Sequence, residues 1–467
     1  MDFRRLLAIA LLLAAACCAP GSQSPSTAGP GGSGALPRDI EREVGPAYVS
    51  QPLQAMVDRV GRKLVADAGL PGTYHFYVLD DPEANAHAIS SGYVFVTRGL
   101  LALIDDEAEL AAAFGHELGH VIKRHAAQRE QARRDVIGAA VDATLTSGSL
   151  SVGRSVAREG LMALRRYSRD QELEADRLGL DYLVHAGYRG TAMISLIEKL
   201  QRQMRLEDKL MTTLSEGFDH GALSTHPDPM QRLEALYTIA EARQGGEGGR
   251  PDYLAAVDGM SVDDAPDEGY VRDQAFLHPA MRFAFEAPSD FHLFNSHDGV
   301  LGIGRDRSLL YFSCLDVEIK EPLDEWMRNQ LKPTPTNIER TQIGGAEAAM
   351  GARPRGADTG LGQIRYVIIR HGNGICYFNL LSEGPERDRR IEALIAASRS
   401  FHTLSTSEAE ALRPYRLHVV PAARTTAAAL AARMPYRDFR MDRLMTLNGV
   451  DTPGELMRKT EIKIVEP

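Results

Sequence analysis

The residue group best suited to chemistry is His116-Glu117-Leu118-Gly119-His120, which lies in a stretch with helical periodicity, Glu107–His125. Histidines four residues apart project from one face of a helix, so both imidazoles can reach a single Zn²⁺ ion at about 2.0–2.1 Å. Glu117 is then beside the position that the ion leaves open for water, where a carboxylate can act as a general base. The alternative is a surface helix with incidental histidines. We predict a zinc site with hydrolytic chemistry.

A second acidic segment offers a third ligand. A catalytic zinc site uses three protein ligands and keeps a fourth position open. In the predicted helix Glu172–His185, Glu172 and Asp176 are four residues apart and share a face, while Glu174 points roughly 200° away at about 100° per residue. We therefore expect Glu172 to be the third ligand and Asp176 to accept the second N–H of a ligating histidine. The alternative is a solvated acidic face.

Three motifs together carry a resemblance to a known family. H-E-L-G-H, the segment Ser168–Gly179 (S-R-D-Q-E-L-E-A-D-R-L-G) and Ser224–Leu233 (S-T-H-P-D-P-M-Q-R-L) resemble the zinc metallopeptidase family of the CAAX prenyl proteases and its soluble periplasmic branch, the BepA-like proteins. The resemblance covers about Asp39–Gln244. It implies that Glu172 is the third zinc ligand and that a strand-bearing segment containing His87, where an apolar aromatic residue is usual, lies above the zinc.

Two further residues gain interest from this resemblance. Relatives use the histidine of T-H-P near the active site, in some as an extra metal contact that holds the enzyme latent, which implies such a role for His226. A histidine before proline in a loop is otherwise a solvated turn residue. Arg232 either contacts a substrate carbonyl or caps the following helix, and the sequence leaves both open.

The first 38 residues predict export and tethering. Arg4 and Arg5 precede the apolar run Leu6–Ala16, which is too short to span a bilayer comfortably, so residues 1–18 resemble a signal peptide. Small residues before Cys17 resemble a lipobox, in which this cysteine would be lipidated; cleavage after Ala-x-Ala is the alternative. Residues 19–38 are rich in Gly, Ser and Pro and predict a flexible linker. We expect a periplasmic protein anchored to a membrane by an N-terminal lipid.

The remaining chain predicts a multidomain architecture. A mainly helical zinc peptidase domain with a small sheet is expected over residues 39–244, a Gly-rich linker over 245–275, an α+β domain of unknown role over 276–405, and a βααβ module over 410–467. The strands of the small sheet are expected at Tyr74–Leu79 and Gly92–Thr97. Leu447-Asn448-Gly449 makes the last module similar to LysM, although Ala422–Thr426 replaces the usual Pro-Gly-Asp-Thr turn.

Composition limits the partners and the remaining chemistry. The chain has 53 Lys and Arg against 63 Asp and Glu, a net charge of −10, so binding of nucleic acid through its phosphates is not expected. Cys314 and Cys376 lie in apolar, strand-like segments of the sequence, far from any motif. They either form a disulfide or stay as two buried thiols.

Two functional hypotheses follow. The first is a zinc-dependent endopeptidase of the bacterial envelope that degrades misfolded or stalled envelope proteins and takes unfolded chains as substrates. The strand-like Gly92–Thr97 segment is expected to pair with an extended substrate, main chain to main chain. The second is a largely latent, cell-wall-associated chaperone or assembly factor with a regulated metal centre, in contact with outer-membrane assembly machinery or peptidoglycan.

Overall fold

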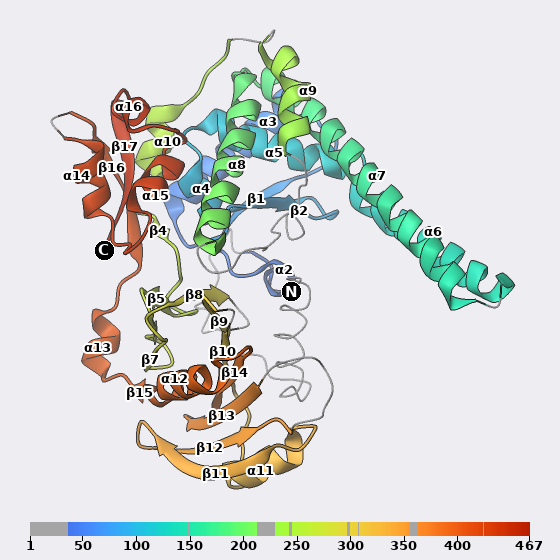
Figure 1. Cartoon of the computed structure of the whole chain (residues 1–467). Coiled ribbons are helices and arrows are strands. Elements are labelled where there is room, and N and C mark those ends of the chain that lie inside the picture. Colours follow the sequence, from blue (N-terminus) through green and yellow to red (C-terminus); the bar gives the residue numbers. More distant parts are fainter. Residues whose placement is uncertain are drawn as a thin grey trace.

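The computed structural model describes residues 36–147, 149–212, 229–241, 245–296, 299–306, 308–354, 363–423 and 425–467 (Figure 1). The N-terminal part is mainly helical, as predicted. Its helices are α2 (Arg38–Val44), α3 (Gln51–Asp67), α4 (Arg98–Leu103), α5 (Glu107–Ile122), α6 (His125–Ser147), α7 (Leu150–His185), α8 (Thr191–Thr212), α9 (Pro229–Glu241) and α10 (Arg250–Val257). No helix in these ranges is long and apolar enough to cross a membrane.

A small sheet lies beside these helices. Its strands are β1 (His75–Leu79), β2 (Ala86–Ala88) and β3 (Tyr93–Thr97), in the order β1-β3-β2. β3 pairs in parallel with β1 and antiparallel with β2, and Phe76, Val94 and Val96 pack into the same hydrophobic cluster as α3 and α5. The two predicted strands are confirmed, and β2 lies closest to α5 of the three.

Glycines bring α5 and α7 into close contact. A side chain at Gly115 would place its Cβ 2.9 Å from the carbonyl oxygen of Gly179, and one at Gly119 would meet the backbone of Ala175 at 3.1 Å. Any larger residue would push the helices apart, because these distances are shorter than ordinary van der Waals contacts. The histidines of α5 and the acidic residues of α7 therefore face each other across a tight helix crossing.

α6 and α7 form a long hairpin. They pack against each other and extend away from the rest of the molecule (Figure 1). The sequence predicted a helix only over Glu172–His185, whereas α7 begins at Leu150.

The middle domain is α+β, as predicted. A seven-stranded antiparallel sheet has the order β11-β12-β13-β14-β10-β9-β8, and a second sheet the order β15-β7-β6-β5. Helix α12 covers one face of the larger sheet and α11 the other, since alternate residues of β13 join the cluster of each helix. Cys314 and Cys376 are opposite each other on β10 and β14 and form a disulfide. The elements are β5 (Tyr270–Arg272), β6 (Ala275–His278), β7 (Phe283–Glu286), β8 (Phe291–Ser296), β9 (Gly299–Gly304), β10 (Leu309–Leu315), α11 (Leu323–Gln330), β11 (Thr336–Ile343), β12 (Ala346–Ala352), β13 (Gln363–His371), β14 (Gly374–Ser382), α12 (Arg387–Arg399) and β15 (His402–Thr403).

The C-terminal segment has the expected order of two strands around helices. After α13 (Thr406–Ala411) come β16 (Tyr415–Pro421), α14 (Ala427–Arg433), α15 (Arg440–Leu447), the short α16 (Pro453–Leu456) and β17 (Glu461–Glu466). β16 pairs with β17 and also with β4 (Ser261–Val262). The similarity to LysM remains a prediction.

This segment docks firmly on the peptidase part. The Lys463 ammonium is fully buried and donates to the carbonyl oxygens of Ala102, Leu103 and Ile104 at the end of α4, at 2.6 to 3.1 Å. Burial lowers the pKa of Lys463 to about 8, an effect that nearby Asp105 partly offsets. Both parts share one hydrophobic cluster.

The stretch predicted as a linker, residues 245–275, differs from that expectation. It contains α10, β4 and β5, and Tyr253 of α10 is fully buried and donates to the carbonyl oxygen of Leu101 at 2.5 Å. The Gly-rich sequence reflects close packing here, because a Cβ at Gly246, whose φ is +100°, would lie 2.5 Å from the backbone of Tyr188.

Candidate metal centre

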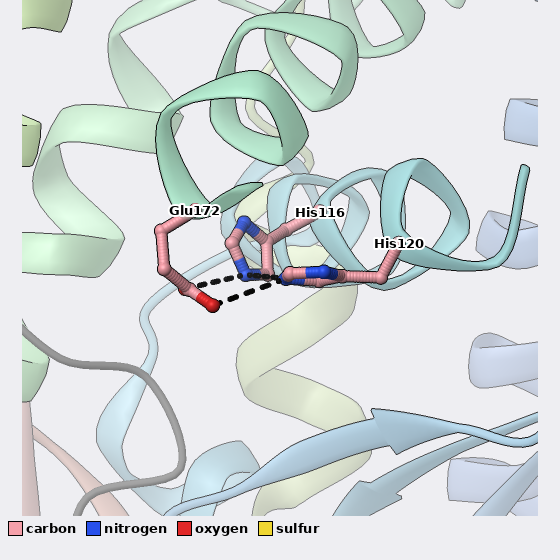
Figure 2. Close-up of side chains that lie close together, drawn as sticks. All are labelled: His116, His120 and Glu172. Carbon is pink, nitrogen blue, oxygen red and sulfur yellow. Dashed lines mark hydrogen bonds and ion pairs between the residues drawn. The ribbon is translucent and has the colours of Figure 1, made fainter. Parts of the chain in front are cut away.

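Three predicted ligands converge at the crossing of α5 and α7 (Figure 2). The Nε2 atoms of His116 and His120 are 3.1 Å apart, and the Glu172 carboxylate oxygens lie 3.4 Å from the former and 3.5 Å from the latter. A tetrahedral ion with bonds of about 2.1 Å holds its ligand atoms about 3.4 Å apart. All three side chains are buried. The arrangement fits a zinc ion with a two-histidine, one-carboxylate ligand set.

Asp176 holds the outer nitrogen of His116. Its Oδ1 lies 2.8 Å from His116 Nδ1, and Arg232 of α9 donates to Asp176 through two bonds of 2.7 Å. Burial alone would lower the pKa of His116, but the bonds to Asp176 and Glu172 outweigh it and raise the pKa to about 9. Burial would raise the pKa of Asp176, but Arg232 and then His116 outweigh it and lower the pKa. The Asp176 carboxylate stays ionised and fixes the His116 ring with Nε2 toward the ligand cluster.

Arg232 is a buried cation beside the carboxylates of the site. Burial would lower the pKa of its guanidinium, but Asp176, Glu172 and Glu117 outweigh it and raise the pKa. Its Nη1 atom lies 3.6 Å from Glu172 Oε2, and its side chain is only 7% exposed. The sequence left open contact with a substrate carbonyl or capping of the following helix. The guanidinium points at the acidic pair of α7, and contact with a substrate carbonyl remains a prediction.

His120 has its own supporting residue, which the sequence analysis missed. His120 Nδ1 lies 2.8 Å from Nδ1 of His125, and His125 Nε2 lies 3.3 Å from Glu174 Oε2. Glu174 also pairs with Lys123 at 2.5 Å. Burial lowers the pKa of His125, with Glu174 opposing, so a neutral ring can accept the His120 Nδ1–H. Glu174 thus faces away from the ligand cluster, as the helical geometry predicted.

The position of His125 depends on the backbone conformation of Arg124, which no sequence motif predicts. α5 ends at Ile122, and Arg124 adopts the left-handed conformation with φ of 55°. That residue separates α5 from α6, and His125, which is only 1% exposed, lies beside His120. A histidine shortly after a zinc-binding helix was the only available signal.

Glu117 is the remaining predicted site residue in the described part of the chain. It lies on α5 between the two histidines in sequence and is 6% exposed. His226 and Cys17 fall outside the described residues. Their roles remain predictions, as does the role of Glu117 as a base.

The sheet corrects one expectation about substrate. β3 has β1 on one side and β2 on the other, so Gly92–Thr97 cannot accept another strand. β2 is the edge strand next to α5, and the ring of His87 on it packs against Phe95 in a tilted arrangement, with ring centroids 5.0 Å apart. The sequence analysis chose Gly92–Thr97 because it is strand-like and expected near the metal, but the order of strands in the sheet places it in the centre.

Comparison with known proteins agrees with this site. Residues 52–240 match the model of Peptidase family M48. The match supports a zinc metalloendopeptidase. The beta-barrel assembly-enhancing protease of Escherichia coli (strain K12) is 30% identical over 209 residues, covering 43% of this chain and 40% of that protein. Metalloprotease YcaL of the same organism is 30% identical over 173 residues, covering 36% and 62%. The mitochondrial metalloendopeptidase OMA1 of Schizosaccharomyces pombe is 30% identical over 195 residues, covering 41% and 53%.

The extent of these matches limits what they support. The aligned segment spans less than half the length of the assembly-enhancing protease, and the family model matches residues 52–240 of this chain. They support the BepA-like branch of the resemblance. The CAAX prenyl proteases and the LysM-like module remain predictions.

Proposed function

We propose that this protein is a zinc-dependent endopeptidase of the bacterial cell envelope that degrades misfolded or stalled envelope proteins. The observation that carries the proposal is the buried cluster of His116, His120 and Glu172, whose donor atoms have the spacing of a tetrahedral site. Relatives named beta-barrel assembly-enhancing protease support the envelope as the setting.

Each residue of the cluster has a distinct task. His116, His120 and Glu172 would hold Zn²⁺, which supplies polarisation of a peptide carbonyl and a lowered pKa of water. Glu117 accepts the proton of the attacking water and delivers it to the departing amide nitrogen. Asp176 and His125 keep the two imidazoles in the tautomer that presents Nε2 to the ion.

Unfolded or misfolded envelope polypeptides are the proposed substrates. An extended chain can pair with the main chain of an edge strand, and among the described strands β2 is the edge of the sheet beside α5. Pairing through the main chain reads little side-chain sequence. Specificity is therefore expected to be loose, with faster cleavage of denatured than of compact proteins.

We also propose a periplasmic location, with the chain held at a membrane by lipid on Cys17. The alternative function, a largely latent chaperone or assembly factor that contacts outer-membrane assembly machinery or peptidoglycan, draws support from the C-terminal segment. That segment is docked on the peptidase part through the buried Lys463.

A proteolysis assay with Glu117→Gln tests the proposal. The variant is expected to keep zinc and fold but to lose cleavage of denatured casein, because an amide cannot accept the proton of water. Glu392→Gln, the same change at an exposed position of α12, is the matched control and should cleave like the wild type. Wild-type activity in Glu117→Gln, or no zinc-dependent cleavage by the wild type, would contradict the proposal.

A further inference from the structure

The α6–α7 hairpin exposes apolar side chains far from the metal centre. Ile137, Val141 and Leu145 on α6 are 53%, 53% and 76% exposed, and Val152 on α7 is 42% exposed. Within the described residues, only Val49, Tyr237 and Met281 are other large apolar side chains with comparable exposure. The hairpin therefore concentrates the exposed apolar surface at one end of the molecule, where it projects from the body (Figure 1).

The exposed residues form a face that is distinct from the packed face of the hairpin. Ile137, Val141 and Leu145 are four residues apart and share one side of α6. The preceding residue, Val136, points toward α7, since a Cβ at Gly160 of α7 would lie 2.5 Å from its Cγ1. Helix α6 thus carries apolar side chains both toward α7 and toward solvent. An apolar helix face is normally buried, yet in the described structure the face of Ile137, Val141 and Leu145 stays more than half exposed.

Charge indicates the kind of partner. Residues 136–153 contain a single ionisable residue, Asp142. Arg133 and Arg134 on α6 and Arg154 and Arg158 on α7 flank this segment and are exposed. Residues 123–170 hold ten Lys and Arg against five Asp and Glu, whereas the rest of the chain holds 43 against 58. The hairpin is a basic arm with an apolar tip on an acidic protein.

We propose that the tip of the α6–α7 hairpin inserts into the headgroup region of an anionic lipid bilayer. Arg133 and Arg134 precede Ile137 by three to four residues, about 4.5–6 Å along the helix axis, so their guanidinium groups reach the headgroups when the apolar tip enters the acyl boundary. Basic residues beside an apolar face are attracted to anionic lipids. The described helices cannot cross a membrane, so the contact is peripheral.

The contact would set the height of the metal centre above the lipid. α6 begins at His125, beside His120, and α7 carries Glu172, so both arms of the hairpin start at the site. Twenty-odd residues at 1.5 Å each place the tip about 30 Å from the ligands. The site would face polypeptides near the membrane surface. This inference concerns docking and does not depend on the proposed peptidase activity.

Vesicle flotation tests the inference. The protein used is a truncated form that begins at residue 36. It lacks the apolar N-terminal segment and Cys17 but retains every residue of the hydrophobic clusters. It is mixed with vesicles of phosphatidylethanolamine and phosphatidylglycerol, or of phosphatidylcholine alone. We expect flotation with the anionic vesicles, weakened by 0.5 M salt and at least tenfold lower with phosphatidylcholine.

Matched variants assign the binding to the tip. Ile137→Ser with Leu145→Ser is expected to lower binding to anionic vesicles at least tenfold, and Arg133→Gln with Arg134→Gln several-fold. Val49→Ser, at an apolar side chain that is 96% exposed but outside the hairpin, should bind like the parent. Unchanged helical content and zinc uptake show that the variants fold. Absence of flotation, equal flotation of the tip variant, or a lipid-free dimer that the tip variant abolishes would overturn the proposal, the last in favour of a second copy of this chain.

Discussion

Replacing Asp176 with asparagine separates two tasks of one buried carboxylate. Asp176 is 0% exposed, and its oxygens lie 2.7–2.8 Å from both His116 Nδ1 and the Arg232 guanidinium. An amide has nearly the same shape but no charge, and its NH₂ must face one of these donors. Arg232 then stays buried with Glu172, 3.6 Å away, as its nearest acidic group.

The magnitudes follow from that geometry. Removing one partner of a buried ion pair costs about 3–5 kcal/mol of folding free energy, because the remaining charge is uncompensated. Loss of the carboxylate that orients a ligating histidine costs about 10–100-fold in metal affinity. Asp176→Asn should therefore lower both the free energy of unfolding and the affinity for zinc, while Asp170→Asn, an exposed change on the same helix, should alter neither.

Adding Arg232→Met distinguishes the two effects. Both charges are then gone, so most of the lost folding free energy should return, while zinc affinity should stay low because a neutral amide oxygen replaces the carboxylate that accepts the His116 Nδ1–H. Denaturant unfolding measures the first quantity, and competition with a chromophoric chelator measures the second. The reasoning is refuted if Asp176→Asn costs less than about 1 kcal/mol, or if Arg232→Met restores stability and zinc affinity together.

Other predictions address the ligands, the middle domain and latency. The wild type should bind about one zinc per chain by elemental analysis, alanine at any one of the three ligands should remove it, and Glu174→Ala should retain it. His125→Phe should weaken zinc binding about 10–100-fold, with partial recovery in His125→Gln; equal affinities would show that His125 does not orient His120. Burial, with a smaller contribution from His371, lowers the pKa of His278 to about 4. The neutral ring therefore makes its full contribution to the free energy of unfolding above pH 6.5, the ordinary pKa of histidine. This contribution of about 3 kcal/mol is lost as the pH falls toward 4. Urea unfolding at pH 7.5 and 4.5 should show a difference that His278→Asn removes. His226→Ala should raise basal proteolysis without loss of zinc if the imidazole holds the site closed; unchanged proteolysis would indicate a solvated turn residue.

The sequence could specify the parts of the site that lie within single helices. Two histidines at i and i+4 share a face in any α-helix, so His116 and His120 converge whatever surrounds them. The same period placed Glu172 and Asp176 on one side of α7 and Glu174 on the other. Aromatic and β-branched residues bounded by turn residues likewise predicted β1 and β3.

Tertiary structure decided which of these faces meet. Gly115 and Gly119 set the distance between α5 and α7, and nothing in their spacing told which helix they would approach. The pairing of Arg232 with Asp176 joins residues 56 apart, and the position of His125 depends on one left-handed residue, Arg124. β3 is central and β2 is the edge because of strand order, which alternation within a strand cannot encode. Periodicity fixes the direction of a side chain relative to its own helix or strand, whereas its partner is chosen by the packing of distant segments.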